Sequence, residues 1–437
     1  MARTKNVRGG RKDAIKATAH KNLPVTQPTD CGTTGAFDEI LDQAEQLLVA
    51  CELEEAQRLC QEVLKSAEFN TRALEVLALI ELESGDTKAA RKLFNRCIAH
   101  SKPTAPPTVH LYLAQLADSP ESSLKHFETA LSILQEKLEV IQKNKQNGDV
   151  PTCPDESTEV VEWSVEEKEV RRSGSRALVG MTELYLTDLC FDPTAEQKCL
   201  DYLSIASSLD PTDPEPLQTL ASVRLSQTNV DAAKEALLLA WDLWRDKSHI
   251  EDSNSTAPDQ MEEDGAEETE SEEDHDDTIP PFDSRVQWSK LAIECDMWSE
   301  AIEVLQQCEA ENDEDGEVQY LLAISWHMMG EDREKQPPSE ASGDTTSIGY
   351  GLDKSECWME AKEYIDSCVQ LRERFGEDSA LDESIMKHIQ ELDTQLQAAG
   401  ITSKSLGDEV ENGEPVAEDD GDQDWDDVSD VDMKPVD

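Results

Sequence analysis

The sequence predicts an all-α protein in which about seven helix pairs stack into a superhelix and a further helix caps the stack. Three observations predict this fold. Apolar residues recur at three- and four-residue spacing along most of the chain, which is the period of an amphipathic helix. Turn residues interrupt this pattern at short intervals. Matching positions in successive helix pairs recur at a constant interval along the chain.

The first helix pair is expected within 37–66 and the second at 71–83 and 87–99. Gly85 suits the position just after a helix, and Asp86 can accept hydrogen bonds from the first amides of the next helix. A helix–turn–helix pair is therefore expected here.

The constant interval, a period of about 34 residues, is visible in the small and large apolar residues of the second helices. Ala56, Cys60 and Val63 recur as Ala90, Phe94 and Cys97, and Cys199, Leu203 and Ala206 recur as Ala233, Leu237 and Ala240. Small residues let helices approach and large ones fill the remaining space. This arrangement resembles the tetratricopeptide repeat. Pairs stacked at this period form a superhelix with a concave groove lined by the first helices.

The remaining pairs are expected to be less regular. They fall at 109–138, with a shortened leading helix, at 175–209, after Pro214, at 283–308, and at 322–330 resuming at 357, followed by the capping helix at 379–398. The domain organisation that follows is a disordered basic arm over 1–35, a solenoid over 36–400 with insertions at about 142–168, 251–281 and 331–353, and a disordered acidic tail over 401–437.

The charge balance restricts the partners. The 437 residues hold 39 Lys and Arg against 96 Asp and Glu, a net charge of −57. Such a chain repels nucleic-acid backbones and anionic lipids, so basic proteins are the expected partners. Residues 251–277 and 408–437 each hold fourteen acidic residues and are too polar to form a core. They either hold a basic partner loosely or act as solubilising tails.

The N-terminal arm has the opposite charge. Residues 1–22 hold seven basic residues and one acid. The arm is interpreted either as an import signal read by a carrier or as a tether that lies on the acidic body.

No enzymatic activity, cofactor or metal site is expected. The sequence lacks phosphate-binding loops, nucleophile elbows and zinc-protease motifs. Its eleven cysteines include no C-x-x-C pair, and no two histidines have the four-residue spacing of a helical metal site. Five cysteines are expected instead to be buried as small hydrophobic residues: Cys60, Cys97, Cys199, Cys308 and Cys368. Without a signal peptide or an apolar run of roughly 18 residues, the expected location is the cytoplasm and nucleus.

Inward-facing positions of the first helices combine acids with apolar and aromatic residues. The predicted partner-binding set is Asp38, Leu41, Glu45, Glu75, Leu79, Glu83, Glu183, Asp188, Asp283, Glu294, Glu317, Tyr320 and His327. Arg and Lys stems can pack on apolar surface while their charged ends pair with carboxylates, so a basic peptide suits this surface. Reversing the charge of Glu45, Glu75 and Glu83 together is expected to weaken binding without unfolding the array. The alternative interpretation is that these charges are simply solvated helix faces.

The order of parts resembles a known family. A basic arm, acidic tetratricopeptide-like pairs with long insertions, and a tail carrying DWDDVSD around Trp425 are similar to the fungal dedicated assembly chaperones of large-subunit ribosomal protein L-four. The resemblance implies a 1:1 complex with that basic protein, shielding of its basic extension, and escort to the nucleus for assembly of the pre-60S particle. An acidic histone or import chaperone and a scaffold subunit of a larger complex remain alternatives. A heat-shock co-chaperone is disfavoured, because acids occupy the surface where its basic residues would lie.

Overall fold

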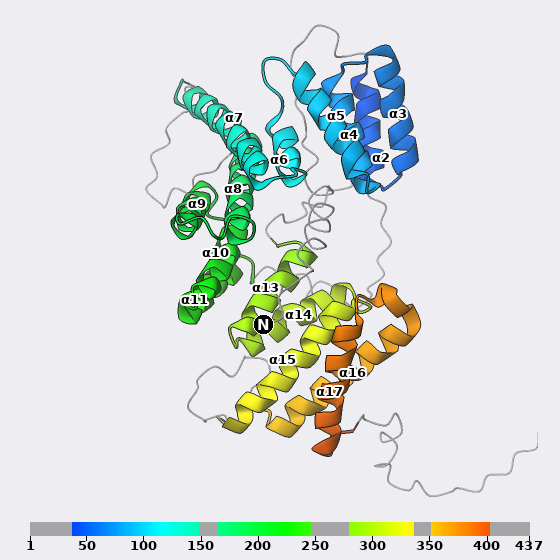
Figure 1. Ribbon diagram of the computed structural model, residues 1–437, viewed down its shortest axis with the longest axis vertical. Helices are drawn as coiled ribbons and strands as arrows, with labels where there is room; N and C mark the ends of the chain where they lie inside the picture. Colours follow the sequence, from blue (N-terminus) through cyan, green and yellow to red (C-terminus); the bar gives the residue numbers. More distant parts are fainter. Residues whose placement is uncertain (1–36, 148–163, 246–278, 336–350, 403–437) are drawn as a thin grey trace, which may run out of the picture.

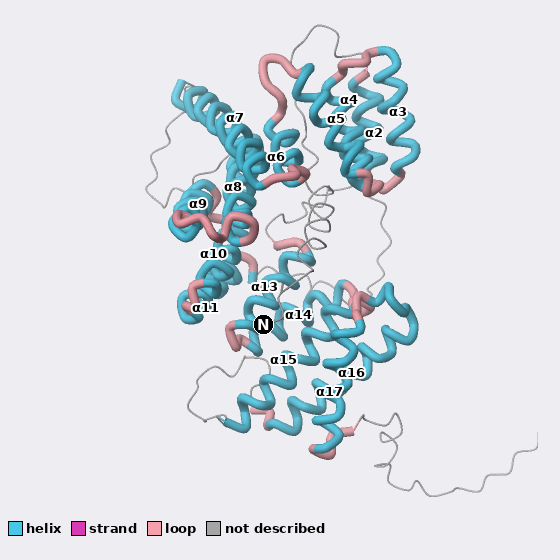
Figure 2. The backbone as a smooth tube through the Cα atoms, viewed as in Figure 1, coloured by secondary structure: helices cyan, strands magenta, loops and turns pink. Residues whose placement is uncertain are grey.

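The computed structural model describes residues 37–147, 164–245, 279–335 and 351–402. Within these ranges it contains fifteen α-helices, one short 3₁₀ helix and no strand (Figure 2). The predicted all-α repeat fold is therefore confirmed. The expectations for the arm at 1–22, the acidic tracts and Trp425 concern residues outside the described ranges.

The described helices form seven antiparallel pairs and a closing helix. The pairs are α2 (Asp38–Val49) with α3 (Leu53–Ser66), α4 (Thr71–Glu83) with α5 (Thr87–His100), α6 (Pro107–Gln115) with α7 (Pro120–Asn147), α8 (Val165–Leu186) with α9 (Ala195–Leu209), α10 (Glu215–Ser226) with α11 (Val230–Asp242), α13 (Phe282–Glu294) with α14 (Trp298–Glu311), and α15 (Gly316–Lys335) with α16 (Lys354–Phe375). The 3₁₀ helix Gly376–Ser379 and α17 (Glu383–Ala398) complete the stack.

Four of the pairs share one turn between their two helices. Cys51, Gly85, Thr228 and Asp296 each adopt a positive φ, between 56° and 85°. In each turn the residue with positive φ and the next one donate backbone hydrogen bonds to carbonyls of the preceding helix, as in Gly85 N to Leu82 O at 2.9 Å and Asp86 N to Glu81 O at 2.8 Å. This is the Schellman pattern that ends a helix. Cys51 and Gly85 are one repeat length apart, and Thr228 and Asp296 are two repeat lengths apart. The turn is therefore part of the repeating unit.

The period also identifies the core. All the second-helix residues that recur with the period in the sequence are buried, and Ala90, Phe94 and Cys97 are fully enclosed. Each pair packs on the next, so the core runs along the stack rather than closing into one globule.

The successive pairs follow an arc (Figure 1). Helices α7, α9 and α11 lie along its outer left edge in this view, while α6, α8, α10 and α13 lie closer to the centre. Helices α11 and α13 pack directly: the indole of Trp288 donates a hydrogen bond to the carbonyl of Leu237 at 3.1 Å, and its ring lies tilted against that of Trp241 with the centroids 5.5 Å apart. The pairs before and after residues 246–278 therefore belong to one stack.

The helices extend into two of the predicted insertions, which corrects their bounds. Residues 142–147 end α7, residues 165–168 begin α8, and residues 331–335 end α15. The start of α8 is polar and was missed because it lacks apolar periodicity. Its stability comes from polar contacts: Ser164 caps the first turn, and Glu167 accepts hydrogen bonds from Arg171 and from Lys145 of α7.

The closing helix α17 covers the last pair. Ile389, Leu392 and Leu396 form its buried stripe. The buried ammonium of Lys362 on α16 lies 2.5 Å from Asp366 and 3.0 Å from Asp393 of α17. A buried amine paired with two carboxylates links the cap to the stack, as expected for a terminal repeat element.

Candidate partner-binding surface

At the N-terminal end of the stack, three carboxylates of α2 surround one guanidinium. Arg72, at the start of α4, donates to Glu45 at 2.8 and 2.9 Å and to Asp42 at 2.5 Å, and it lies 3.9 Å from Asp38. Hydrogen bonding to Glu45 raises the pKa of Arg72 above its already high usual value. Three negative charges against one positive charge leave this Arg72 cluster with a net charge of −2 at the protein surface.

Two members of the cluster, Asp42 and Arg72, were not predicted, although the sequence carries a signal for them. Asp38 and Arg72 lie one repeat length apart, so they occupy the same position in adjacent repeats. Equivalent positions of stacked repeats are neighbours in space. Opposite charges at this spacing therefore indicate an ion pair between repeats.

Glu75 lies in the interior, which corrects its assignment to the binding surface. Its side chain is only 5% exposed and accepts a hydrogen bond from the hydroxyl of Thr108 at 2.6 Å. Burial raises the pKa of Glu75 to about 6, with a further contribution from the negative charge of Glu45. A lysine in this place would bury an unpaired charge, so the triple charge reversal is instead predicted to destabilise the array.

Three further members of the predicted set are also buried: Leu41, Leu79 and His327. His327 stacks on Trp358 at 5.2 Å between ring centroids, and burial lowers its pKa. Neighbouring helices cover these positions, and in the case of His327 the covering helix is α16, the partner of α15 in the same pair. They support the fold and do not present a surface to a partner.

The other predicted residues lie at or near the surface in separate places. Glu83 is half-buried at the end of α4, Glu183 and Asp188 are exposed at the end of α8, and Asp283 and Glu294 are exposed at opposite ends of α13. Thus the structure brings Asp38 and Glu45 together and leaves these five residues distributed along the arc.

The last two predicted residues make contacts within the protein. Glu317 pairs with Lys290 of α13 at 2.7 Å. The hydroxyl of Tyr320 shares a hydrogen bond with Nδ1 of His388 on α17 at 2.8 Å. Because cations such as Lys290, Arg72 and Arg171 lie among the acids of the first helices, the surface formed by these helices is mixed in charge rather than uniformly acidic.

The cysteines follow the sequence-based expectation. All five named as small core residues are buried, and burial raises the pKa of Cys60 and of Cys368 to about 12. Their thiols are thus protonated at neutral pH and poor nucleophiles.

Within the described ranges, no group of three or more His, Cys, Asp or Glu side chains is arranged to hold a metal ion. In those same ranges, no helix is both long enough and apolar enough to cross a bilayer.

The seven pairs, the shared turns and the capping helix define a tetratricopeptide-repeat solenoid with charged clusters on its surface. No family model matches the sequence. Two curated fungal proteins are similar to it, both named "Probable assembly chaperone of rpl4". The Schizosaccharomyces pombe protein is 29% identical over 340 residues, covering 77% of this chain and 83% of that protein. The Emericella nidulans protein is 25% identical over 408 residues, covering 89% and 88%.

A solved structure of a protein with the same kind of title is also similar to this chain. The structure titled "Assembly Chaperone of RpL4 (Acl4) (Residues 1-338)" superposes with a TM-score of 0.52 and 27% identity, covering 68% of this chain and 98% of that one. The resemblance to the fungal assembly chaperones expected from the sequence is confirmed.

Proposed function

We propose that this chain is an assembly chaperone that binds a newly made large-subunit ribosomal protein of the L4 type and delivers it for ribosome assembly. The observation that carries the proposal is the 29% identity over 340 residues to a fungal protein named as a chaperone of rpl4. The similarity spans most of both chains, so it covers the repeat array as a whole rather than one generic repeat.

The charge of the chain supports the same role. A ribosomal protein extension that threads through rRNA is rich in Lys and Arg, and free in the cell it would bind RNA unspecifically. A partner with a net charge of −57 attracts such a segment and keeps it from other polyanions. Ribosomal RNA, with its denser charge and specific contacts, would then displace the chaperone. The protein acts in this scheme by binding, without a chemical step.

The Arg72 cluster is the place in the described structure where we expect a basic side chain of the client to bind. Its net charge of −2 leaves carboxylate oxygens that can accept further hydrogen bonds. Asp38 and Asp42 are the more accessible members, with side chains 38% and 57% exposed.

We further propose that the complex is 1:1 and that it moves from cytoplasm to nucleus, where pre-60S particles assemble. The basic arm at 1–22 is a candidate signal for a nuclear import carrier. Tagging the chain with and without these residues in living cells tests this part separately from client binding.

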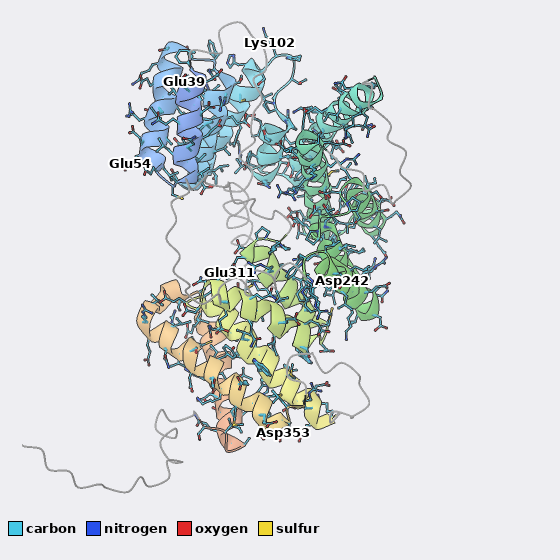
Figure 3. The ribbon with its side chains drawn as sticks, turned by 180° about the vertical axis from the view of Figure 1, so that it is seen from behind. Glu39, Glu54, Lys102, Asp242, Glu311 and Asp353 are labelled. Atoms are coloured by element: carbon cyan, nitrogen blue, oxygen red, sulfur yellow. The ribbon has the colours of Figure 1, made fainter. Side chains whose placement is uncertain are left out.

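The binding experiment compares two double variants. Asp38→Lys with Asp42→Lys reverses the cluster and leaves the Glu45–Arg72 pair in place. Glu54→Lys with Glu62→Lys makes the same change in net charge on exposed positions of α3, where Figure 3 labels Glu54. We expect the first variant to weaken binding of purified cognate L4 about tenfold in calorimetry, and the second to change it about twofold or less.

Three outcomes would count against the proposal in different ways. Equal losses in both variants would mean that only overall charge matters and would remove the role of the Arg72 cluster. Unchanged affinity in both would place the contact elsewhere. Failure of the unmodified chain to bind L4, while it binds core histones or a neutral protein, would overturn the function itself.

A further inference from the structure

The outer surface of α9 and α11 exposes branched aliphatic side chains. Ile205 on α9 is 54% exposed, and Leu239 and Leu238 on α11 are 51% and 40% exposed. Ile205 and Leu239 lie one repeat length apart, so they occupy the same position of two consecutive repeats. The exposed aliphatic residue therefore recurs with the period of the solenoid.

This position is polar in the other described second helices. Aligning the buried residues of each second helix places Glu62, Arg96, Thr129, Gln307 and Ser367 there. A single exposed leucine on a protein surface is common. Ile205 and Leu239, however, occupy the same position on neighbouring repeats, and this position is polar elsewhere. Together they form an apolar strip on the outside of the arc.

Each aliphatic residue has an acidic neighbour on the same helix face. Asp201 precedes Ile205 by four residues and Glu235 precedes Leu239 by four, and both acids are exposed. Residues four apart lie side by side on a helix surface. Asp242, labelled in Figure 3 at the end of α11, adds a third carboxylate to this outer surface. We call these residues the acid–aliphatic face.

We propose that the basic N-terminal arm of this chain docks on the acid–aliphatic face. The arm carries the complementary pattern: Arg3 precedes Val7 by four residues, and Arg11 precedes Ile15 by four. These basic and aliphatic residues of the arm are complementary in charge and polarity to the acids and aliphatic residues of α9 and α11. Opposite charges orient the contact, while burial of the aliphatic groups stabilises it.

The other acidic segments of this chain, and a second copy of it, have the wrong charge to occupy the acid–aliphatic face. The tracts at 251–277 and 408–437 each carry fourteen acids, so the acids of the face repel them. A second copy of the chain brings another net charge of −57 and is repelled as well. Among the segments outside the described residues, the arm at 1–22 has the net positive charge that the face requires.

The arm is long enough to reach. Ile15 lies 22 positions before Phe37 and Val7 lies 30 positions before it, so an extended chain reaches about 70 Å to Ile15 and about 100 Å to Val7 at roughly 3.3 Å per residue. The α8–α9 and α10–α11 pairs lie three and four repeats from the first pair, at most about 60 and about 80 Å along a stack of helices spaced 8–10 Å apart. Docking therefore requires no rearrangement of the stack.

The test places a photo-crosslinking benzoylphenylalanine at position 15 of the full-length protein, without any client. After illumination, mass spectrometry of the digested monomer identifies the attached peptides. We expect crosslinks within one molecule to 195–209 and 230–242. Crosslinks to other helices, crosslinks between copies, or no crosslink would each overturn the proposal.

Matched variants distinguish docking on the acid–aliphatic face from a general attraction of the basic arm to the acidic protein. Ile205→Lys with Leu239→Lys is expected to lower the yield of these crosslinks about tenfold. Thr129→Lys with Glu62→Lys, at the same repeat position on α7 and α3, adds more positive charge and is expected to leave the yield within about twofold. All four side chains are exposed, so circular dichroism should show unchanged folding. An equal loss in both double variants would overturn the assignment to this face.

Discussion

At the scale of single residues, Glu75 illustrates how stacking changes the role of a side chain. Its position in the first helix of a repeat faces inward, and in an isolated pair it would meet solvent. In the stack it is buried beside Thr108 of α6, and its pKa rises from 4.5 to about 6. The folded state thus prefers the protonated form. Its contribution to stability is full below about pH 4.5 and is lost as the pH rises through 6.

Glu75→Gln should therefore stabilise the protein at neutral pH. The amide keeps an oxygen that can accept the hydrogen bond from Thr108 but carries no charge to desolvate. A shift of this size corresponds to about 2 kcal/mol in the free energy of unfolding at pH 7.5, and the gain should shrink below pH 5. Urea unfolding at the two pH values measures it.

The control for this prediction is Glu62→Gln, since Glu62 is exposed on α3. It should change stability by less than about 0.5 kcal/mol at either pH. A gain from Glu75→Gln that is equal at pH 5 and pH 7.5 would show that the pKa of Glu75 is not the cause.

At the scale of elements, the shared turn shows that the repeat keeps a backbone conformation more strictly than a residue type. Gly85 adopts φ of +85° at little cost, whereas Thr228 adopts +58° with a branched side chain. A left-handed conformation costs a non-glycine residue roughly 1–2 kcal/mol. The turns at Cys51, Thr228 and Asp296 form nonetheless, because packing of the two helices on each side determines them.

Thr228→Gly should accordingly raise the free energy of unfolding by about 1 kcal/mol, since relief of the strain exceeds the added flexibility of the unfolded chain. Gly85→Ala is the matched opposite change and should lower it by about the same amount. No heavy atom lies within 4 Å of a Cβ added at Gly85, so a clash would not confuse the result. Thermal unfolding of both variants measures the effect. Destabilisation by Thr228→Gly would contradict the argument.

The helices show what the sequence could predict and what it could not. Apolar periodicity located the seven pairs and the buried second-helix residues, because burial of small and large apolar groups is what the repeat requires. It missed the first ten residues of α8, where ion pairs among Lys145, Glu167 and Arg171 stabilise a polar helix. Ion pairs between elements distant in sequence leave no periodic apolar signal.

At the scale of the whole molecule, the predicted binding surface was only partly right about which side chains are accessible. Charge and repeat position correctly place Asp38, Asp283 and Glu294 at the surface. They do not reveal that Glu75 is covered by α6 or that Arg72 neutralises part of the α2 cluster. Accessibility in a solenoid depends on the neighbouring repeats, and a pattern read within one repeat does not contain that information.

The distribution of charge has a consequence for the stability of the whole chain. Local ion pairs such as Arg58–Glu55 are exposed, and exposed pairs contribute at most about 1 kcal/mol each. Acids outnumber cations by 96 to 39 in the chain, so repulsion among carboxylates dominates the electrostatic free energy of the folded array. Salt screens this repulsion over distances beyond about 10 Å at 0.1 M.

The protein alone should therefore become more stable with salt, while its complex with a basic client becomes weaker. Raising NaCl from 20 to 300 mM should raise the melting temperature on the order of 3 °C, because screening reduces repulsion more in the compact state than in the expanded one. Choline chloride at equal ionic strength should give the same rise, and glucose at equal osmolality should not. A melting temperature that falls with salt would mean that attractive ion pairs, rather than repulsion among the excess carboxylates, dominate the folded state.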